Sequence, residues 1–371
     1  MVNYKKINVA LIGCGRISHK HITSIIKLND SICLKAICDI KQNNLDEVYD
    51  LIENLFSKFN YKNEKVFSFL DYEELLNAIK AGAIDINLIV LCTPSGFHVK
   101  QSIAAAKLSL NVITEKPLAT SLEDGKKILK AFKNKNTNLF VVLQNRLNPT
   151  VKLLKKQILK KRFGKIYLIT SNIFWQRPQQ YYDQATWRGT KLMDGGALLN
   201  QASHYVDLLC YLPNLKVNKV SSFTKTLARK IEMEDTAVIN LEYANGALGS
   251  LAVTMLSYPK NLEGSLTIFG ENGTVRIGGI AMNKIETWEF KDDDNDDDLV
   301  ESTNYEVDSV YGSGHIYFYE EIISFLNNLN NSTDNLFNAN EAFYGLEAIM
   351  AAYKSSIEES TVSLPMQIWE I

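Results

Sequence analysis

In the first 143 residues, short apolar runs alternate with amphipathic helical segments, and this alternation restricts the fold more than any other feature. The apolar runs have the length and composition of buried strands, and continuous apolar character is typical of parallel strands covered on both faces. Strands and helices in alternation imply right-handed crossovers and therefore a doubly wound α/β sheet. The expected strands are Ile7–Ile12, Ile32–Cys38, Ile86–Cys92, Leu110–Thr114 and Leu139–Leu143. The expected helices are Ile17–Leu28, Leu45–Phe59, Tyr72–Ile79, Phe97–Leu108 and Leu122–Phe132.

The pattern changes near residue 150, where strand-like runs begin to follow one another directly. Asn245-Gly246 between two alternating segments is a strong hairpin signal. We therefore predict two domains, residues 1–148 and 149–371, the second an α+β domain with a large, mostly antiparallel sheet. Its expected strands are Ile166–Trp175, Val217–Thr226, Asp235–Tyr243, Ala247–Leu256, Ser265–Phe269, Thr274–Ile277 and Ile285–Phe290. Its expected helices are Gly195–Leu212, Ile316–Leu329 and Glu341–Ile357.

The composition excludes several classes of function. A net charge of −2 with interspersed lysines and carboxylates offers no attraction to nucleic acid or to anionic membranes. No segment has the apolar length of a membrane span, and no apolar leader precedes the first strand, so we expect a cytoplasmic protein. The five cysteines show neither disulfide nor metal spacing. The acidic run Asp292–Asp298 lacks ordered ligand spacing and is expected to be a solvated, self-repelling loop, so no metal is predicted.

A glycine turn follows the first strand directly and opens a helix. Gly13 permits the tight turn, and Gly15 allows the backbone to approach a pyrophosphate at the helix N-terminus. Ser18 stands where the usual pattern has a third glycine or alanine. Asp39 closes the second strand, where a carboxylate accepts hydrogen bonds from ribose hydroxyls and repels a 2′-phosphate. The turn therefore predicts a Rossmann dinucleotide-binding domain with NAD, in preference to NADP, as cofactor.

Two more turns follow apolar strands at the edge of the sheet where ligands bind in open α/β folds. Thr93-Pro94-Ser95-Gly96-Phe97-His98 is placed to line a cofactor cleft. Glu115-Lys116-Pro117 places a lysine where it can polarise a hydroxyl or stabilise an alkoxide. A surface lysine in a turn is the alternative for Lys116.

The segment from Gly195 to Asp207 is the strongest candidate for catalytic chemistry in the second domain. Asn200 and His204 are four residues apart, so on a helix both project from one face. A histidine that titrates near neutrality, held on rigid backbone beside a carboxamide, is suited to proton transfer. The alternative is a structural histidine on a half-apolar helix.

These motifs together resemble the glucose–fructose oxidoreductase/inositol dehydrogenase/rhizopine-catabolism family of sugar dehydrogenases, over nearly the whole chain. The resemblance adds Arg146, which precedes Pro149, and implies that Lys116 and His204 are the catalytic pair. Many members carry aspartate where this chain has Asn200. That departure weakens a proton relay through this position and suits a carboxamide that binds substrate.

Motifs and resemblance together assign the binding residues. Those expected to bind NAD are Gly13, Gly15, Arg16, Ile17, Asp39, Thr93, Pro94, Ser95, His98, Glu115, Lys116, Gln144 and Arg177. Those expected to bind substrate are Lys116, Arg146, Trp187, Arg188, Asn200, Gln201, His204 and Tyr311.

The segments 175–182, 187–190 and 200–207 are similar to the branch of this family that acts on nucleotide-activated sugars in bacterial surface-polysaccharide pathways. Arginines suited to carboxylate or pyrophosphate and aromatic rings suited to a base or sugar are compatible with that branch. The likeness implies NAD-dependent oxidation of the C3 hydroxyl of UDP-N-acetyl-2-amino-2-deoxyglucuronate, with a UDP-sugar as the partner. Dehydrogenation of UDP-N-acetylglucosamine, of a free sugar or of inositol, and non-catalytic NAD or sugar sensing, are the alternatives. The family resemblance also implies a homo-oligomer, a tetramer, formed through a free sheet face.

Overall fold

The computed structural model describes residues 6–62, 65–133, 136–307, 314–327, 337 and 339–367. The chain divides into two compact units. The first comprises residues 1–118, 126–142 and 315–339, and the second comprises residues 119–125, 143–314 and 340–371. No helix within the described ranges is long and apolar enough to cross a membrane.

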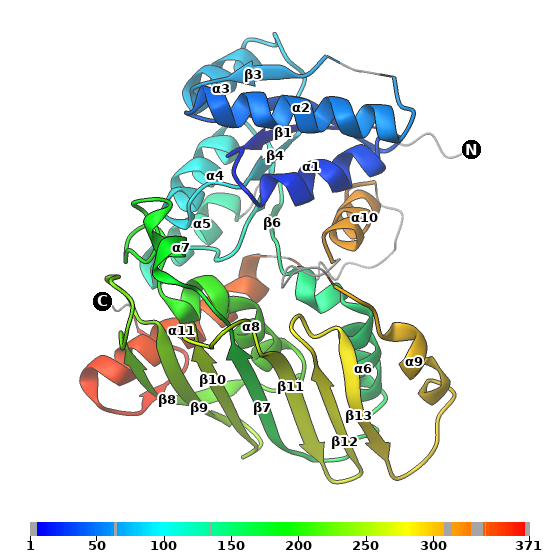
Figure 1. Ribbon diagram of the computed structural model, residues 1–371, viewed down its shortest axis with the longest axis vertical. Coiled ribbons are helices and arrows are strands. Elements are labelled where there is room, and N and C mark those ends of the chain that lie inside the picture. Colours follow the sequence, from blue (N-terminus) through cyan, green and yellow to red (C-terminus); the bar gives the residue numbers. More distant parts are fainter. Residues whose placement is uncertain are drawn as a thin grey trace. The chain divides into compact units, whose positions relative to one another are not determined.

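The first unit is built on a six-stranded parallel sheet in the order β3-β2-β1-β4-β5-β6 (Figure 1). Its central strands are buried on both sides, as their continuous apolar sequences predict. The doubly wound arrangement predicted from the alternating pattern is confirmed. The strands are β1 (Ile7–Ile12), β2 (Ile32–Cys38), β3 (Phe67–Phe69), β4 (Leu88–Leu91), β5 (Asn111–Thr114) and β6 (Leu139–Val141).

Helices follow these strands in turn, and α1 packs beside α2 (Figure 1). The helices are α1 (Ser18–Lys27), α2 (Gln42–Lys58), α3 (Tyr72–Lys80), α4 (His98–Lys107) and α5 (Leu122–Phe132). A further helix, α10 (Gly314–Leu326), comes from far along the chain, and from His315 onward it belongs to the first unit. Beyond α10, the carbonyl oxygen of Phe337 accepts the amide of Val141 on edge strand β6 at 2.9 Å.

The second unit contains an eight-stranded sheet in the order β13-β12-β11-β7-β10-β9-β8-β14. All described neighbours are antiparallel except β7 and β10, which run parallel, so the predicted mostly antiparallel sheet is confirmed. The strands are β7 (Ile166–Phe174), β8 (Val217–Lys225), β9 (Thr236–Tyr243), β10 (Leu248–Thr254), β11 (Glu263–Gly270), β12 (Gly273–Gly278), β13 (Lys284–Phe290) and β14 (Val362–Ser363).

One face of this sheet is covered by helices. Helix α8 packs on β7, α6 packs on β12, and Ser355 of α11 accepts the amide of Ser222 on β8. On the other face, exposed or half-exposed side chains alternate with the buried ones along β7, β9 and β10. The helices of this unit are α6 (Pro149–Leu159), α7 (Gln179–Asp183), α8 (Ser203–Tyr211), α9 (Val300–Thr303) and α11 (Ala339–Glu358).

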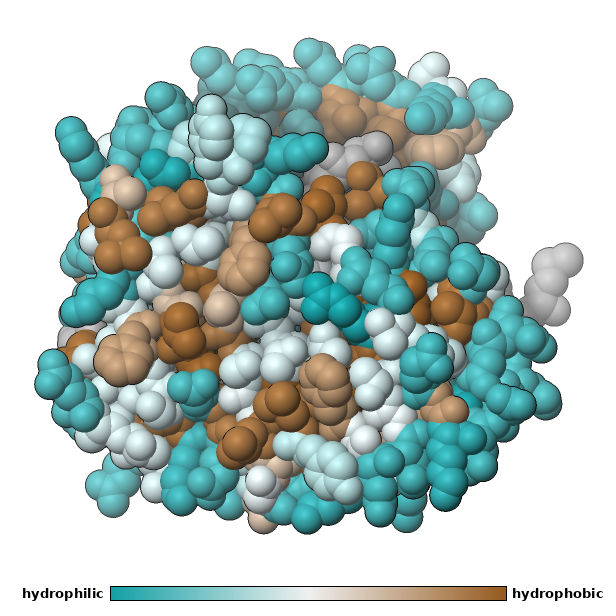
Figure 2. Space-filling model, turned by 60° about the horizontal axis from the view of Figure 1, so that its bottom comes forward, coloured by the Kyte–Doolittle hydropathy of each residue, from teal (hydrophilic) through white to brown (hydrophobic). Residues whose placement is uncertain are grey.

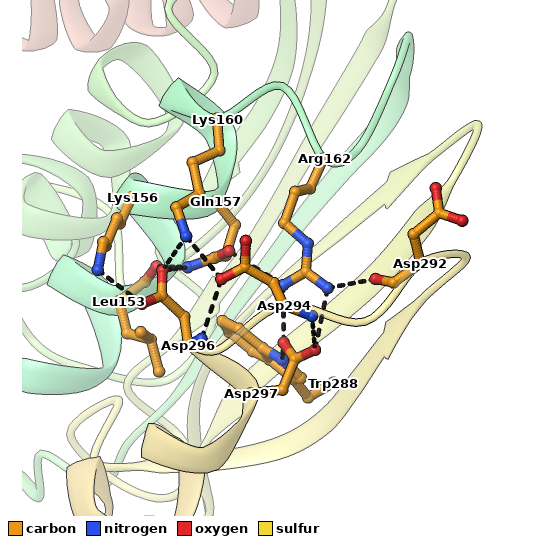
Figure 3. A network of polar contacts seen from close by, with 10 residues as sticks. All are labelled: Leu153, Lys156, Gln157, Lys160, Arg162, Trp288, Asp292, Asp294, Asp296 and Asp297. Atoms are coloured by element: carbon orange, nitrogen blue, oxygen red, sulfur yellow. Dashed lines mark hydrogen bonds and ion pairs between the residues drawn. The ribbon is translucent and has the colours of Figure 1, made fainter.

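The acidic run beyond β13 is not the self-repelling loop that its composition suggests. Its carboxylates face basic side chains at the end of α6 (Figure 3). Asp297 also accepts a hydrogen bond from the Trp288 indole at 2.7 Å, and the Arg162 guanidinium lowers the pKa of Asp297 to about 2. The ion pairs are Lys156–Asp296, Lys160–Asp294 and Arg162–Asp297, with nitrogen–oxygen distances of 2.6, 2.6 and 2.7 Å.

Candidate active site

The glycine turn after β1 has the geometry that a dinucleotide requires. Gly13 has φ +91° and donates its amide to the carbonyl oxygen of Cys38 at 2.8 Å. A Cβ at Gly13 would lie 2.7 Å from the carbonyl carbon of Cys92, so no larger residue fits there. A Cβ at Gly15 would meet no atom within 4 Å, which leaves this side of the turn open to a ligand.

Asp39 supports this turn from the end of β2. Its carboxylate accepts the amide of Cys14 at 2.8 Å and the amide of Lys41 at 2.9 Å. Ser18, at the third position of the glycine pattern, is fully buried and donates its hydroxyl to the carbonyl oxygen of Gly15. The hydroxyl is therefore accommodated by a local hydrogen bond, and the turn fits NAD, with Arg16 and Ile17 within it.

The predicted lysine motif lies directly after β5. Lys116 is half-buried, and its peptide bond to Pro117 is cis. The carboxylate of Glu115 accepts the amide of Lys116 at 3.1 Å. On the other side, the ring nitrogens of His98 lie 2.9 Å from the carbonyl oxygens of Pro117 and Thr93. Among the predicted NAD ligands, His98 thus joins the Thr93–His98 turn to the lysine turn.

Four of the predicted ligands in the second unit form one polar cluster with Tyr181. The Nε of Arg177 donates to the Gln201 side chain at 3.1 Å. The hydroxyl of Tyr181 accepts hydrogen bonds from Arg188 at 2.8 Å and from Gln201 at 3.3 Å. The Arg188 guanidinium also lies over the Trp187 ring, 4.5 Å from its centre. Two guanidinium groups and two aromatic rings thus lie within one contact network.

Asn200 is linked to this cluster and to a buried carboxylate. Its carbonyl oxygen accepts from the Gln201 amide at 3.1 Å, and its own amide donates to Asp194 in a short hydrogen bond. Asp194 is 2% exposed and also accepts the amide of Gly189. A carboxylate therefore lies beside position 200 although the residue there is asparagine, and Asp194 supplies it.

The helix predicted over Gly195–Leu212 is interrupted, so Asn200 and His204 do not share a regular helical face. Residues Ala197–Gln201 form a wide turn in which the amide of Ala202 bonds to the carbonyl of Ala197, five residues back, at 2.8 Å. Such wide turns within helices are frequent at functional sites. Helix α8 then begins at Ser203 and carries His204, 8% exposed, in its first turn.

Helix α8 is anchored by a buried ion pair. Arg146 donates from Nε and Nη2 to the two oxygens of Asp207, at 2.8 and 2.6 Å, and both residues are less than 5% exposed. Its guanidinium also lies over the Tyr211 ring, 4.1 Å from the centre. The structure thus gives Arg146 an internal partner one helical turn from His204, and substrate binding by Arg146 stays a prediction.

A buried carboxylate caps the wide turn. Glu234 accepts the amide of Leu198 at 2.8 Å and the hydroxyl of Tyr353 at 3.1 Å. No described residue donates to its second oxygen, which a Cβ at Gly196 would approach within 2.0 Å. A side chain at position 196 would therefore displace the Glu234 carboxylate. Burial raises the pKa of Glu234 to about 7, against the opposing effect of its two hydrogen bonds.

Glu234→Gln is expected to stabilise the protein at pH 8 by up to about 3 kcal/mol relative to wild type, and to have little effect at pH 5. The raised pKa means that native stability is complete below the unfolded value and is lost as pH rises from there to about 7, because the unfolded carboxyl ionises in this range while the buried one keeps its proton. Glutamine keeps an acceptor for the Leu198 amide and cannot ionise. Urea unfolding of both proteins at the two pH values measures the difference, and a difference independent of pH would contradict the assignment.

The remaining site residues are placed less completely. Gln144 is 3% exposed, and its Oε1 accepts from no described group, which fits a polar ligand. Tyr311 lies outside the described residues.

Within the described chain, one group of residues has side chains that could bind a metal ion, namely His21, Glu115 and His315. Three ligands are one fewer than a closed structural zinc site has, and His21 is hydrogen-bonded to Glu115 at 3.0 Å.

Comparison with known proteins assigns the family. Residues 7–143 match the model described as "Oxidoreductase family, NAD-binding Rossmann fold", and residues 155–364 match "Oxidoreductase family, C-terminal alpha/beta domain". The solved WlbA dehydrogenase of Bordetella pertussis, in complex with NADH and UDP-GlcNAcA, is 42% identical with a TM-score of 0.86, covering 99% of this chain and 100% of that one. The corresponding complex from Chromobacterium violaceum is 40% identical with a TM-score of 0.88, covering 99% and 98%. Myo-inositol 2-dehydrogenase of Thermotoga maritima is 25% identical over 96% of this chain and 98% of its own.

Proposed function

Because the chain belongs to this family of NAD-binding oxidoreductases, GFO_IDH_MocA, we propose that it oxidises the C3 hydroxyl of UDP-N-acetyl-2-amino-2-deoxyglucuronate. The chain is an NAD-dependent dehydrogenase that acts on CH–OH groups. The finer assignment rests on the 40–42% identity to two WlbA dehydrogenases crystallised with UDP-GlcNAcA.

The substrate class is inferred from the polar cluster of Arg177, Tyr181, Trp187, Arg188 and Gln201, to which Asn200 is linked. Guanidinium groups bind carboxylates and phosphates in bidentate fashion, and the aromatic rings offer flat surfaces for a base or sugar. A free polyol has no anionic group for two arginines. The cluster therefore favours an anionic nucleotide sugar over inositol.

In the proposed reaction, bound NAD supplies the hydride acceptor for the hydrogen on C3. His204 takes the proton of the C3 hydroxyl as general base. Lys116 stabilises the oxyanion as the carbonyl forms. The products are the 3-keto sugar, NADH and a proton that leaves through His204.

The test is the NADH absorbance that develops when the enzyme and NAD are mixed with UDP-GlcNAcA, UDP-GlcNAc or myo-inositol. The uronate is expected to exceed UDP-GlcNAc by about ten- to a hundredfold in kcat/KM, because it alone offers a carboxylate to the arginines. Equal or faster turnover of inositol would reject the nucleotide-sugar assignment while leaving the dehydrogenase assignment intact.

We also propose that the helix-free sheet face pairs with a second copy of this chain, in a tetramer. Phe223 on β8 and Val238 on β9 are register partners on this face, 71% and 44% exposed. In the lower part of Figure 2, hydrophobic and neutral residues intermingle, as in surfaces that pair with other subunits.

Phe223→Glu combined with Val238→Glu is expected to reduce the mass in solution to that of one chain, 41.9 kDa, in light scattering after gel filtration. Two buried, unpaired charges are costly at a subunit interface. Leu159→Glu, at the exposed end of α6, is the control and should leave the mass unchanged. An unchanged mass in the double variant would place the interface elsewhere.

A further inference from the structure

A chain of buried polar groups runs from helix α10 to the backbone of Lys116, entirely within the first unit. The Tyr319 hydroxyl lies 2.7 Å from Nδ1 of His21, and Nε2 of His21 lies 3.0 Å from Oε1 of Glu115. The second carboxylate oxygen accepts the Lys116 amide at 3.1 Å. His21 and Tyr319 are fully buried, and Glu115 is 7% exposed.

The protons in this chain can be assigned. Burial acts to raise the pKa of Glu115, but the hydrogen bond from His21 and the nearby His315 ring hold it well below its usual value, so the carboxylate is ionised. An ionised carboxylate only accepts hydrogen bonds, so Nε2 of His21 must carry the donating proton. Nδ1 of His21 is then left to bond to the Tyr319 hydroxyl at 2.7 Å. Both ring nitrogens of His21 and both oxygens of Glu115 therefore have hydrogen-bond partners in this chain.

Helix α10 contributes two residues to this arrangement from one face, four positions apart. Tyr319 bonds to His21, and the His315 ring packs edge-to-face against the His21 ring, with centres 5.1 Å apart. Nε2 of His315 lies 3.6 Å from the same Glu115 oxygen. Burial lowers the pKa of His315, so it approaches the carboxylate as a neutral ring. Glu115 is therefore enclosed by α1 and α10.

We propose that Tyr319, His21 and Glu115 form a positioning relay that fixes the Lys116 turn for catalysis, with α10 as its anchor. The proposal rests on the proposed function only in taking Lys116 as the catalytic lysine. The relay holds the amide side of Lys116, while His98 lies against the Pro117 carbonyl on the other side. The turn between them has little freedom, as a pre-organised catalytic group requires.

Tyr319→Phe is the main test, because it removes the hydroxyl that bonds to His21 and keeps the buried ring. We expect kcat to fall about tenfold, in the range typical of outer-shell positioning groups, with the KM values for NAD and sugar within about twofold of wild type. Tyr49→Phe is the matched control, since it removes a hydroxyl that donates to the Val66 carbonyl elsewhere in the same unit. Equal kcat values in the two variants would overturn the relay.

Two further variants separate positioning from general damage to the core. Glu115→Gln can still accept the Lys116 amide and donate to His21 in its other tautomer, whereas Glu115→Leu can do neither. We expect Glu115→Gln to retain at least about tenfold more kcat than Glu115→Leu. Equal losses of kcat would show that the carboxylate acts only through packing.

A readout that needs no substrate distinguishes failure of the relay from failure of the proposed function. Acylation of Lys116 by a water-soluble succinimidyl ester, measured by mass spectrometry, should quicken at least about threefold in Tyr319→Phe as the turn loosens. Exposed Lys100 and Lys107 in the same digest are the internal references. An unchanged Lys116 rate overturns the relay even if no sugar is oxidised, and a changed rate supports it whatever the sugar.

Discussion

Replacing His204 by asparagine is expected to lower kcat about a thousandfold, because a positioned general base contributes on the order of 10²–10⁴ to the rate. Asparagine retains a polar group of similar reach and cannot accept the hydroxyl proton. His204 lies in the first turn of α8, in the second unit, whereas the glycine turn and Asp39 belong to the first. The dissociation constant for NADH should therefore stay within about twofold of wild type.

Stopped-flow measurement of NADH formation at saturating UDP-GlcNAcA gives kcat, and NADH fluorescence titration gives cofactor affinity. A base that has been removed also alters the pH profile, so the acidic limb of kcat should disappear in the variant. Turnover near the wild-type rate would remove His204 from the mechanism. A parallel loss of NADH affinity would instead indicate a disrupted fold.

The largest effect on stability is expected from Asp207→Ala, which should lower the free energy of unfolding by about 3–5 kcal/mol. The change leaves the Arg146 guanidinium, 4% exposed, without the carboxylate that accepts two of its hydrogen bonds. The Glu341 carboxylate lies 3.9 Å from Nη2 of Arg146 and does not reproduce that two-point geometry. The midpoint of urea unfolding, followed by circular dichroism, measures the loss.

The double variant Arg146→Met, Asp207→Leu provides the control for this stability change. Removing both charges leaves no unpaired ion, so the double variant should be clearly more stable than Asp207→Ala. If Asp207→Ala cost less than about 1 kcal/mol, the pair would not be the anchor of α8.

The alternation of apolar runs and helices was enough to predict the parallel sheet of the first unit, because burial on both faces leaves a continuous apolar signature. The edge strand Phe67–Phe69 escaped that reasoning. It is three residues long and its first residue is exposed, so its sequence shows neither a long apolar run nor an alternation of apolar and polar residues. Its parallel pairing with β2 is what makes it a strand of the sheet.

The break within 195–212 could not be predicted from spacing within the segment, because side chains outside it bond to the turn. Glu234 caps the turn at Leu198, and Asp194 binds the Asn200 side chain. The spacing of residues along one helix does not indicate such partners. For the same reason the pairing of Arg146 with Asp207 could not be predicted, because the two residues are 61 positions apart in the sequence. The predicted NAD turn needed no distant partner to be recognised, since its glycines and Asp39 act through local backbone geometry.

Helix α10 lies late in the sequence, and this affects how the first unit folds as the chain leaves the ribosome. Residues 7–143 emerge first and contain all six strands of the parallel sheet, yet the partner of the Val141 amide and the Tyr319 hydroxyl are translated nearly two hundred residues later. Until then the nascent unit holds the Glu115 carboxylate with only part of its buried hydrogen bonding, so the sheet can form early while the lysine turn settles last. Synthesis itself therefore leaves the proposed relay at Lys116 incomplete until residues 143–314 of the second unit have been made.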